Sequence, residues 1–142
     1  MMITKNYEII LKYVKDLSVE IPSPDTFIFS REYITKYSLG INITTNPIKN
    51  EMIEIITKLT YKDPSENKKK SFFEILFSTV IKINNKSLKK EELERIILCD
   101  VQNEIYPELE RIFIGIIRDS GFPDLKLDKK INFEDLYQQK VN

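Results

Sequence analysis

NEIYPELERIFIGIIRDSGFPDLKL, which occupies residues 103–127, predicts a long helix and its exit turn. Its apolar residues recur at steps of three and four, the spacing that places one apolar stripe along a helix. These residues are Ile105, Leu109, Ile112, Phe113, Ile116 and Ile117. Gly121 stands where a left-handed cap is favoured, and Pro123 follows where no helix can continue. The helix is therefore expected to end just before Gly121, with its stripe covered by another element.

Two residues inside this helix are unusual. Pro107 lacks a backbone donor, so either Asn103 caps a helix that begins just before it, or a longer helix kinks there.

Gly115 costs about 1 kcal/mol relative to Ala in a helix interior, which favours close approach of another backbone. Ile114 beside it forms a second apolar patch, and a helix that is apolar on more than one side predicts a partner subunit. The simpler alternative is burial in the core of one domain. The candidate oligomer interface comprises Leu109, Ile112, Phe113, Ile114, Gly115 and Ile117.

Composition sets the class of protein and excludes much enzyme chemistry. At 142 residues the chain is expected to form one domain, residues 1–142. Its 22 Lys and Arg residues balance 22 Asp and Glu residues, which argues against a nucleic-acid partner. The absence of histidine excludes a Ser-His-Asp triad and any His-ligated zinc site, and 3 glycines leave no phosphate-cradling loop. The lone Cys99 is expected to be a buried apolar side chain. We therefore expect no enzyme, no cofactor and no metal.

No stretch of the chain has the length or composition of a signal peptide or of a membrane-spanning helix. A single cysteine also fits a reducing compartment. The expected location is therefore the cytoplasm, without direct insertion into a membrane.

Four strands are predicted before the first helix, over residues 7–21, 33–43, 52–61 and 71–83. Residues 26–32 are expected to form a connection, and residues 63–70, DPSENKKK, a polar hairpin loop with Lys68, Lys69 and Lys70 in solvent. In the first strand, alternation puts Tyr7, Leu11 and Tyr13 on the apolar face, and it puts acidic residues on the polar face.

Helices follow the strands. Ser87 is expected to cap a helix that runs through Leu98, and Asn132 a last helix with Phe133, Leu136 and Tyr137 as its apolar members. Strands followed by helices are typical of the α+β class, with a four-stranded antiparallel sheet and helices packed on one face.

Two blocks of sequence together resemble a known family. Residues 13–22 read Y-x-K-D-L-S-x-E-x-P, and residues 121–137 read GFPDLKLDKKINFEDLY. Both are similar to the SecB family of bacterial protein-export chaperones, in the same order and at a similar separation. The resemblance implies a SecB-like homotetramer, a dimer of dimers packed through the long helix. It also implies a cytosolic chaperone that holds unfolded secretory precursors without ATP and delivers them to the SecA motor.

The resemblance also implies two sets of site residues. The positions that match SecA docking are Asp16, Glu20, Phe72 and Glu74. The positions that match the apolar precursor-binding groove are Tyr37, Leu39, Ile41, Phe73, Ile75, Phe133, Leu136 and Tyr137.

Two alternatives remain at this stage. The protein could be a SecB-like chaperone dedicated to one client, such as an antitoxin. It could also be an oligomeric interaction scaffold whose apolar helix builds the assembly and leaves no accessible groove.

Overall fold

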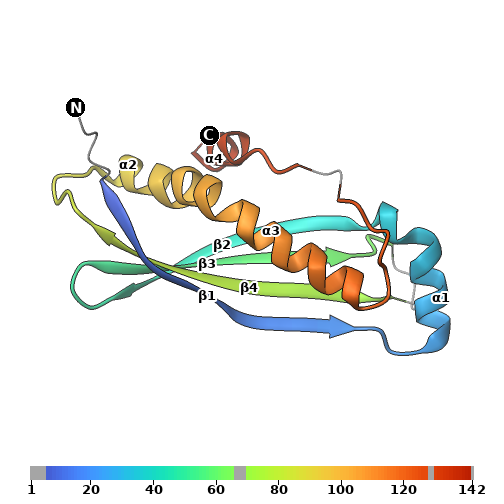
Figure 1. Ribbon diagram of the computed structural model, residues 1–142. Coiled ribbons are helices and arrows are strands. Elements are labelled where there is room, and N and C mark those ends of the chain that lie inside the picture. Colours follow the sequence, from blue (N-terminus) through green and yellow to red (C-terminus); the bar gives the residue numbers. More distant parts are fainter. Residues whose placement is uncertain (1–5, 66–69, 128–129, 142) are drawn as a thin grey trace.

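A computed structural model describes residues 6–65, 70–127 and 130–141 as a sheet covered on one face by helices (Figure 1). The strands are β1 (Tyr7–Glu20), β2 (Ser38–Ile48), β3 (Met52–Lys62) and β4 (Phe72–Ile83). The helical segments are α1 (Pro24–Tyr33), η1 (Ile34–Lys36), α2 (Lys90–Arg95), η2 (Ile96–Asp100), α3 (Val101–Asp119) and α4 (Phe133–Val141). The predicted α+β class with a four-stranded antiparallel sheet is confirmed, whereas the predicted order of four strands before the first helix is wrong, because α1 lies between β1 and β2. The lysines at positions 68 and 69 lie outside the described residues.

The sheet has the strand order β1-β4-β3-β2, and all of its pairs are antiparallel. Residues that pair directly share a face, so Ile41, Leu59, Ile75 and Leu17 form one row across all four strands. This face packs against α3, and we call the opposite face the outer face. Strands β1 and β2 are the two edges.

The long helix supplies the other half of the core. The stripe residues Ile105, Leu109, Phe113 and Ile117 of α3 are buried against the sheet. Full burial of each such side chain is worth roughly 1.5–3 kcal/mol, so this one stripe fixes the helix on the sheet. After α3, Gly121 adopts a φ of 126°, which confirms the predicted left-handed turn.

One helical rod runs from Lys90 to Asp119 through α2, η2 and α3, so the expected break between two helices is wrong. Pro107 lies inside α3, which begins at Val101. The helix is therefore longer than one that Asn103 would cap just before Pro107. The π-helical turn η2 leaves the Ile97 carbonyl to accept from Nε2 of the buried Gln102, at 3.2 Å. The Oε1 atom of Gln102 accepts in turn from Thr57 Oγ1 at 3.0 Å, which ties the turn to β3.

The ends of the other helices agree in part with the sequence. The α2 helix begins at Lys90, and Ser87 instead donates its backbone N–H to Asn85 Oδ1 in a preceding turn. The predicted cap of α4 is confirmed, because Asn132 Oδ1 accepts from the backbone N–H of Asp135 at 3.1 Å. No helix among the described residues is long and apolar enough to cross a membrane.

Residues 24–33 form α1 where a connection was expected. Ser23 caps this helix by accepting from the Thr26 backbone N–H at 3.1 Å, and Pro24 occupies the first turn. Strand β2 therefore begins at Ser38, five residues later than predicted, and continues through Pro47 to Ile48. A proline is tolerated there because β2 is an edge strand.

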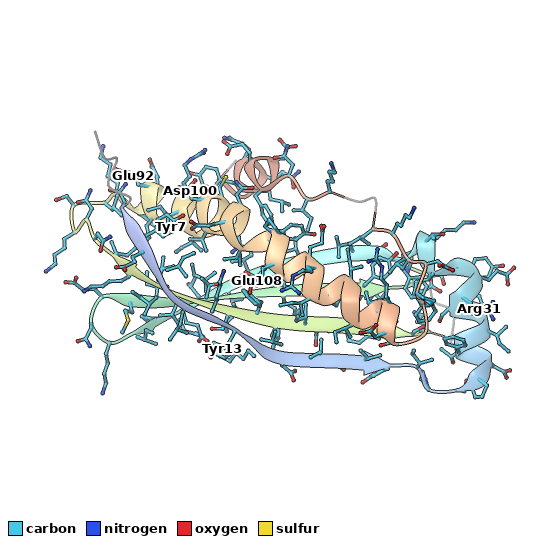
Figure 2. All side chains as sticks on the ribbon, viewed as in Figure 1. Tyr7, Tyr13, Arg31, Glu92, Asp100 and Glu108 are labelled. Atoms are coloured by element: carbon cyan, nitrogen blue, oxygen red, sulfur yellow. The ribbon has the colours of Figure 1, made fainter. Side chains whose placement is uncertain are left out.

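Two β-bulges interrupt β1, between residues 9 and 11 and between residues 14 and 16. The first bulge moves Leu11 and Tyr13 opposite Val80 and Ser78, onto the outer face. Their predicted placement on the same face as Tyr7 is therefore wrong. Figure 2 shows Tyr13 on the side of the sheet away from the α3 helix. Leu11 is 47% exposed and Tyr13 is 45% exposed.

Candidate functional site

An apolar groove lies between the edge strand β2 and the helices. One cavity of about 120 Å³ is lined by Ile41, Asn42 and Ile43 of β2, Leu98 of η2 and Leu136 of α4. A second cavity, of about 500 Å³, shares two of these residues, so the two cavities are adjacent. Its lining residues are Ile43, Thr44, Thr45, Glu94, Ile97 and Leu98. We call this combined feature the β2 groove.

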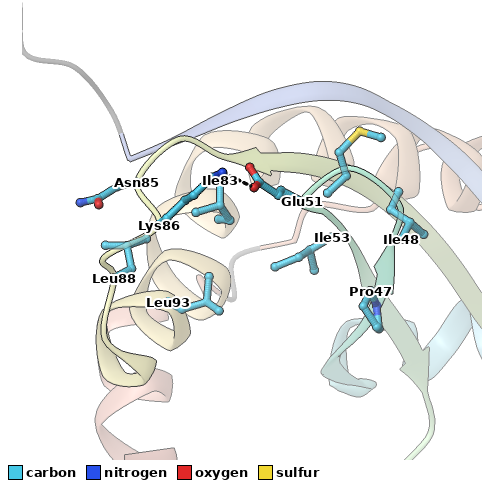
Figure 3. A pocket seen from close by; sticks show the side chains of 10 residues that line it. Pro47, Ile48, Glu51, Ile53, Ile83, Asn85, Lys86, Leu88 and Leu93 are labelled. Carbon is cyan, nitrogen blue, oxygen red and sulfur yellow. Dashed lines mark ion pairs between the residues drawn. The ribbon is translucent and has the colours of Figure 1, made fainter.

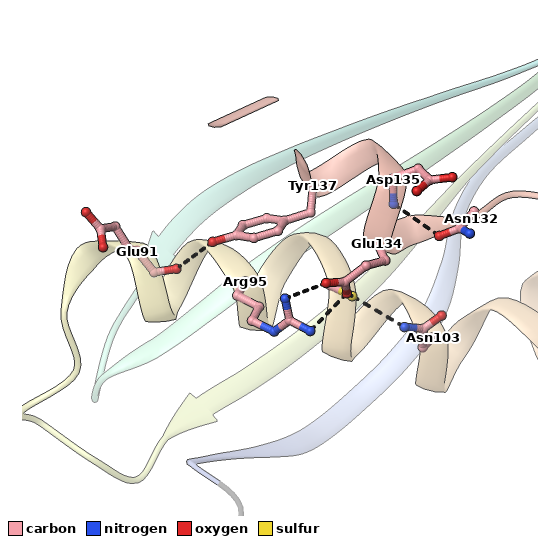
Figure 4. Close-up of polar contacts among 8 residues, drawn as sticks. Glu91, Arg95, Asn103, Asn132, Glu134, Asp135 and Tyr137 are labelled. Atoms are coloured by element: carbon pink, nitrogen blue, oxygen red, sulfur yellow. Dashed lines mark hydrogen bonds and ion pairs between the residues drawn. The ribbon is translucent and has the colours of Figure 1, made fainter. Parts of the chain in front are cut away.

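Helix α4 forms one wall of the β2 groove and is fastened by polar contacts (Figure 4). The Arg95 guanidinium donates to both carboxylate oxygens of Glu134, each at 2.9 Å. This ion pair lowers the pKa of Glu134 and raises that of Arg95. Arg95 also lies over the Tyr137 ring, 5.6 Å from its centroid. The Arg95–Glu134 pair is about half exposed, so it sets the position of α4 more than the overall stability.

Behind this ion pair, the Cys99 thiol donates to Glu134 Oε2 at 3.1 Å. Burial, together with the neighbouring carboxylate, raises the pKa of Cys99 to about 11. The thiol is therefore protonated at neutral pH and is a poor nucleophile, in agreement with its expected role as a buried apolar side chain.

The structure divides the eight predicted groove residues into two groups. Four of them, Tyr37, Phe73, Ile75 and Phe133, are at most 2% exposed and belong to the core, so their contact with a client stays a prediction that this burial does not support. Phe133, for example, packs edge-on against the Tyr106 ring of α3 at 5.3 Å.

The other four predicted groove residues are half-buried: Leu39, Ile41, Leu136 and Tyr137. Ile41 and Leu136 line one cavity together. Sequence reasoning missed Ile43 and Leu98, although Ile43 lies in the apolar register of its strand and Leu98 ends the apolar run of its helix.

The four predicted docking residues come together on the outer face. In the register of β1 against β4, Asp16 pairs with Leu76, Ser18 with Glu74, and Glu20 with Phe72. The second bulge of β1 restores the alternation, so Asp16, Glu20, Phe72 and Glu74 share one face. We call these four residues the acidic patch.

A lysine partly neutralises the acidic patch. Lys58 Nζ of β3 lies 3.6 Å from Glu74 Oε1, whereas Asp16 and Glu20 are exposed. The negative charge that this face offers to a partner therefore comes mainly from β1.

A hydrogen-bonded carboxylate holds the centre of the outer face. Glu54 of β3 accepts from Lys15 Nζ at 2.9 Å, Ser78 Oγ at 2.7 Å, Asn46 Nδ2 at 3.3 Å and Tyr13 OH at 3.5 Å. These donors come from the three other strands. The hydrogen bond from Lys15, followed by that from Ser78, lowers the pKa of Glu54 to about 2. Glu54 is therefore ionised at neutral pH and ties the strands together.

Comparison with known proteins agrees with this architecture. The family model described as preprotein translocase subunit SecB matches residues 3–142. The chain belongs to the SecB family.

Several SecB relatives match nearly the whole chain. A Pelagibacter ubique protein, provisionally named protein-export protein SecB, is 48% identical over 139 residues, covering 98% of this chain and 99% of that protein. The protein-export protein SecB of Rhodopseudomonas palustris is 27% identical over 133 residues, covering 94% of this chain and 79% of that protein. The protein-export protein SecB of Bartonella bacilliformis is 24% identical over 135 residues, covering 95% of this chain and 83% of that protein.

A solved structure has the same fold. It is that of a Mycobacterium tuberculosis SecB-like chaperone in complex with a peptide from an antitoxin. It superposes with a TM-score of 0.63 at 11% identity and covers 88% of this chain and 91% of that one.

The predicted interface of this SecB subunit lies largely inside its own core. Leu109, Phe113 and Ile117 are at most 1% exposed, so their contact with a partner subunit stays a prediction that this burial does not support. Ile112 also packs against the core of the subunit. The remaining two residues, Ile114 and Gly115, are half-buried on α3, and no atom beyond the adjoining backbone of the helix lies within 4 Å of the position of a Cβ at Gly115.

The edge strand β1 presents the more extensive apolar surface. Within the described chain β1 pairs only with β4, and six of its apolar residues are between 38% and 47% exposed. They are Ile10, Leu11, Tyr13, Val14, Leu17 and Val19. A free edge with this composition is typical of a strand that is covered in an assembly.

Proposed function

We propose that this SecB-family protein is a holding chaperone of protein export that binds unfolded secretory precursors in the β2 groove. The observation that carries the proposal is the groove itself, an open surface built from β2, α2, η2 and α4 that is apolar around Ile41, Leu98 and Leu136. Apolar burial is non-directional, so such a surface binds many unrelated sequences as long as they are unfolded. Release of a precursor from such a surface requires no covalent chemistry, and we therefore propose that the protein works without ATP. We also propose that it acts in the cytoplasm.

One cavity does not suffice to hold a precursor. Burial of one large apolar side chain is worth roughly 1.5–3 kcal/mol, whereas association costs an estimated 4–15 kcal/mol in lost freedom. Several side chains must therefore bind together along the groove. Repetition of the groove in an oligomer raises the effective concentration of further sites for the same precursor.

We further propose a homotetramer, a dimer of dimers, with Ile114 and Gly115 of α3 at one contact. The exposed apolar edge of β1 supports a second contact between subunits. Light scattering of the purified protein tests this proposal. A mass of one subunit at micromolar concentration would contradict it.

The acidic patch is the proposed docking site for SecA. It lies on the outer face, whereas the β2 groove opens on the side of the helices, so precursor and motor could bind at the same time. We expect Asp16→Lys with Glu20→Lys to weaken SecA binding and reduce its dependence on salt, with precursor binding retained. The matched control is Glu32→Lys with Asp119→Lys, because both residues are exposed and lie outside the acidic patch. Equal loss of SecA binding in the control would refute the assignment.

The decisive experiment is a calorimetric titration, without nucleotide, of one secretory precursor in its unfolded and its folded form. We expect binding of the unfolded form alone. Leu136→Ser should weaken that binding, and Ile28→Ser should not, since Ile28 is 64% exposed on α1 and lines none of the cavities above.

The failures of this titration are informative. No binding of either form would refute the proposal and favour an oligomeric scaffold. Binding of only one among several unfolded precursors would favour a chaperone dedicated to a single client.

A further inference from the structure

A third cavity lies at the far end of β2, beyond the β2 groove. It measures about 430 Å³ and is mostly apolar, with Pro47, Ile48 and Ile53 on the side of the β2–β3 hairpin and Ile83, Leu88 and Leu93 opposite. Figure 3 shows Leu88 and Leu93 on one side of the cavity and Pro47 and Ile53 on the other. We call this cavity the hairpin pocket.

The lining of the hairpin pocket begins where that of the β2 groove ends. Along β2, Ile43, Thr45 and Pro47 pair with residues 57, 55 and 53 of β3, so they share the face that carries the groove. On the helical side, Leu93 of the hairpin pocket adjoins Glu94 of the groove. The three cavities therefore lie in series along one edge strand.

The middle of this series differs from its ends. Thr45 and Glu94 make it polar, and the half-buried Glu94 carboxylate forms no ion pair with any residue in the described part of the chain. A carboxylate that forms no ion pair within the described residues attracts a cationic side chain of a ligand. At the hairpin pocket, by contrast, Lys86 is paired with Glu51 at 2.8 Å, which leaves the apolar walls to select the ligand.

We propose that the hairpin pocket is a second anchor site for the client segment held in the β2 groove. This inference rests on the proposed chaperone function. The segment runs extended along β2 with one large apolar side chain between Ile41 and Leu136, and a second one in the hairpin pocket. A basic or polar residue faces Glu94 between them.

The spacing of the two anchors follows from β2 itself. Pro47 is four residues from Ile43 and six from Ile41. At about 3.3 Å per residue of extended chain, this separation corresponds to roughly 13–20 Å. Clients should therefore carry their apolar anchors four to six residues apart, and closer pairs cannot occupy both sites.

The test uses the full-length protein and fluorescein-labelled polar peptides of equal length. One peptide carries a single Phe, the second carries two Phe residues five positions apart with Arg between them, and the third carries two Phe residues two positions apart. We expect the five-residue spacing to lower Kd about 10- to 100-fold relative to the single Phe, the range for burial of one further large side chain. The two-residue spacing should give little gain.

Variants assign the gain to its site. Ile48→Ser should remove the gain of the five-residue peptide, whereas the single-Phe peptide should still bind between Ile41 and Leu136. Ile48 is 42% exposed, so this change should not impair folding. Glu94→Gln should weaken the Arg-containing peptide about 2- to 5-fold, the range for one exposed ion pair. The control is again Ile28→Ser.

Two results would separate this inference from the proposed function. If the single-Phe peptide binds and depends on Leu136, but both two-Phe peptides bind equally well or Ile48→Ser has no effect, the hairpin pocket is not an anchor site and the chaperone proposal stands. If no peptide binds in a way that depends on Leu136, the proposed function itself fails.

Discussion

Glu54 offers a quantitative test of how the outer face is held together. In the variant Glu54→Gln the charge is removed while the side chain keeps its size. The variant loses the ion pair with Lys15, and it weakens the hydrogen bond from the fully buried Ser78. Because the contacts of Glu54 reach all three other strands, the cost should appear in the unfolding of the whole domain.

The pKa of Glu54 sets the size of the effect. A fall from the ordinary value of 4.5 to about 2 is a shift of about 2.5 units, worth at most about 3.4 kcal/mol at 1.36 kcal/mol per unit. The side chain of Lys15 is 38% exposed, so solvent screening reduces this figure, and we expect about 2 kcal/mol at pH 7. Because the folded pKa lies below the unfolded one, this contribution is complete above about pH 4.5 and is lost as the pH falls towards 2.

Urea denaturation at fixed protein concentration measures the effect at pH 7 and at pH 3. The parent protein should exceed Glu54→Gln by about 2 kcal/mol at pH 7 and by less than half of that at pH 3. Lys15→Met should cost less than Glu54→Gln, because the Ser78 and Asn46 hydrogen bonds remain. A gap of the same size at both pH values would refute the reasoning, since it would show that ionisation of Glu54 does not carry the stability.

Three further predictions concern other sites. Gly121→Ala should cost about 1–3 kcal/mol in thermal unfolding, because φ is 126° and a Cβ would lie 2.5 Å from the Phe27 ring; an unchanged melting temperature would contradict this. Gly115→Ala should stabilise the subunit by about 1 kcal/mol but weaken assembly in light scattering, and an unaltered oligomer would remove Gly115 from the interface. Cys99 should react with Ellman's reagent at pH 8 at least about 100-fold more slowly in the folded than in the urea-unfolded protein, and comparable rates would show that the thiol is accessible.

Helix α1 escaped sequence analysis because its buried side is polar. Its buried residues are Thr26 and Ser30, and the Ser30 hydroxyl lies in a hydrogen-bonded cluster with Tyr37 and Ser71. Apolar periodicity therefore has no stripe to detect in this segment. The one available signal is Ser23 followed by Pro24, the pattern of a capped helix start.

Both helical segments of the rod from Lys90 to Asp119 were predictable, and their continuous junction was not. The apolar stripe and the Gly121 turn are local features of the chain, and both are confirmed. The continuation through η2 depends on Gln102, which satisfies the π-helical turn by reaching Thr57 on another element. A contact of that kind leaves no periodic signal in the sequence.

By itself, the sequence determined the existence of the four strands, the class of the fold and the two blocks that resemble SecB, because alternation, capping and turn residues act over a few positions. Only the tertiary structure decided which apolar residues are buried and which remain open. Phe133 lies in the core and Leu136 lines the groove, although both belong to one short helix. The groove joins Ile41, Leu98 and Leu136, which are far apart in the chain. The physical reason is that burial depends on which elements meet, whereas amphipathicity is a property of each element alone.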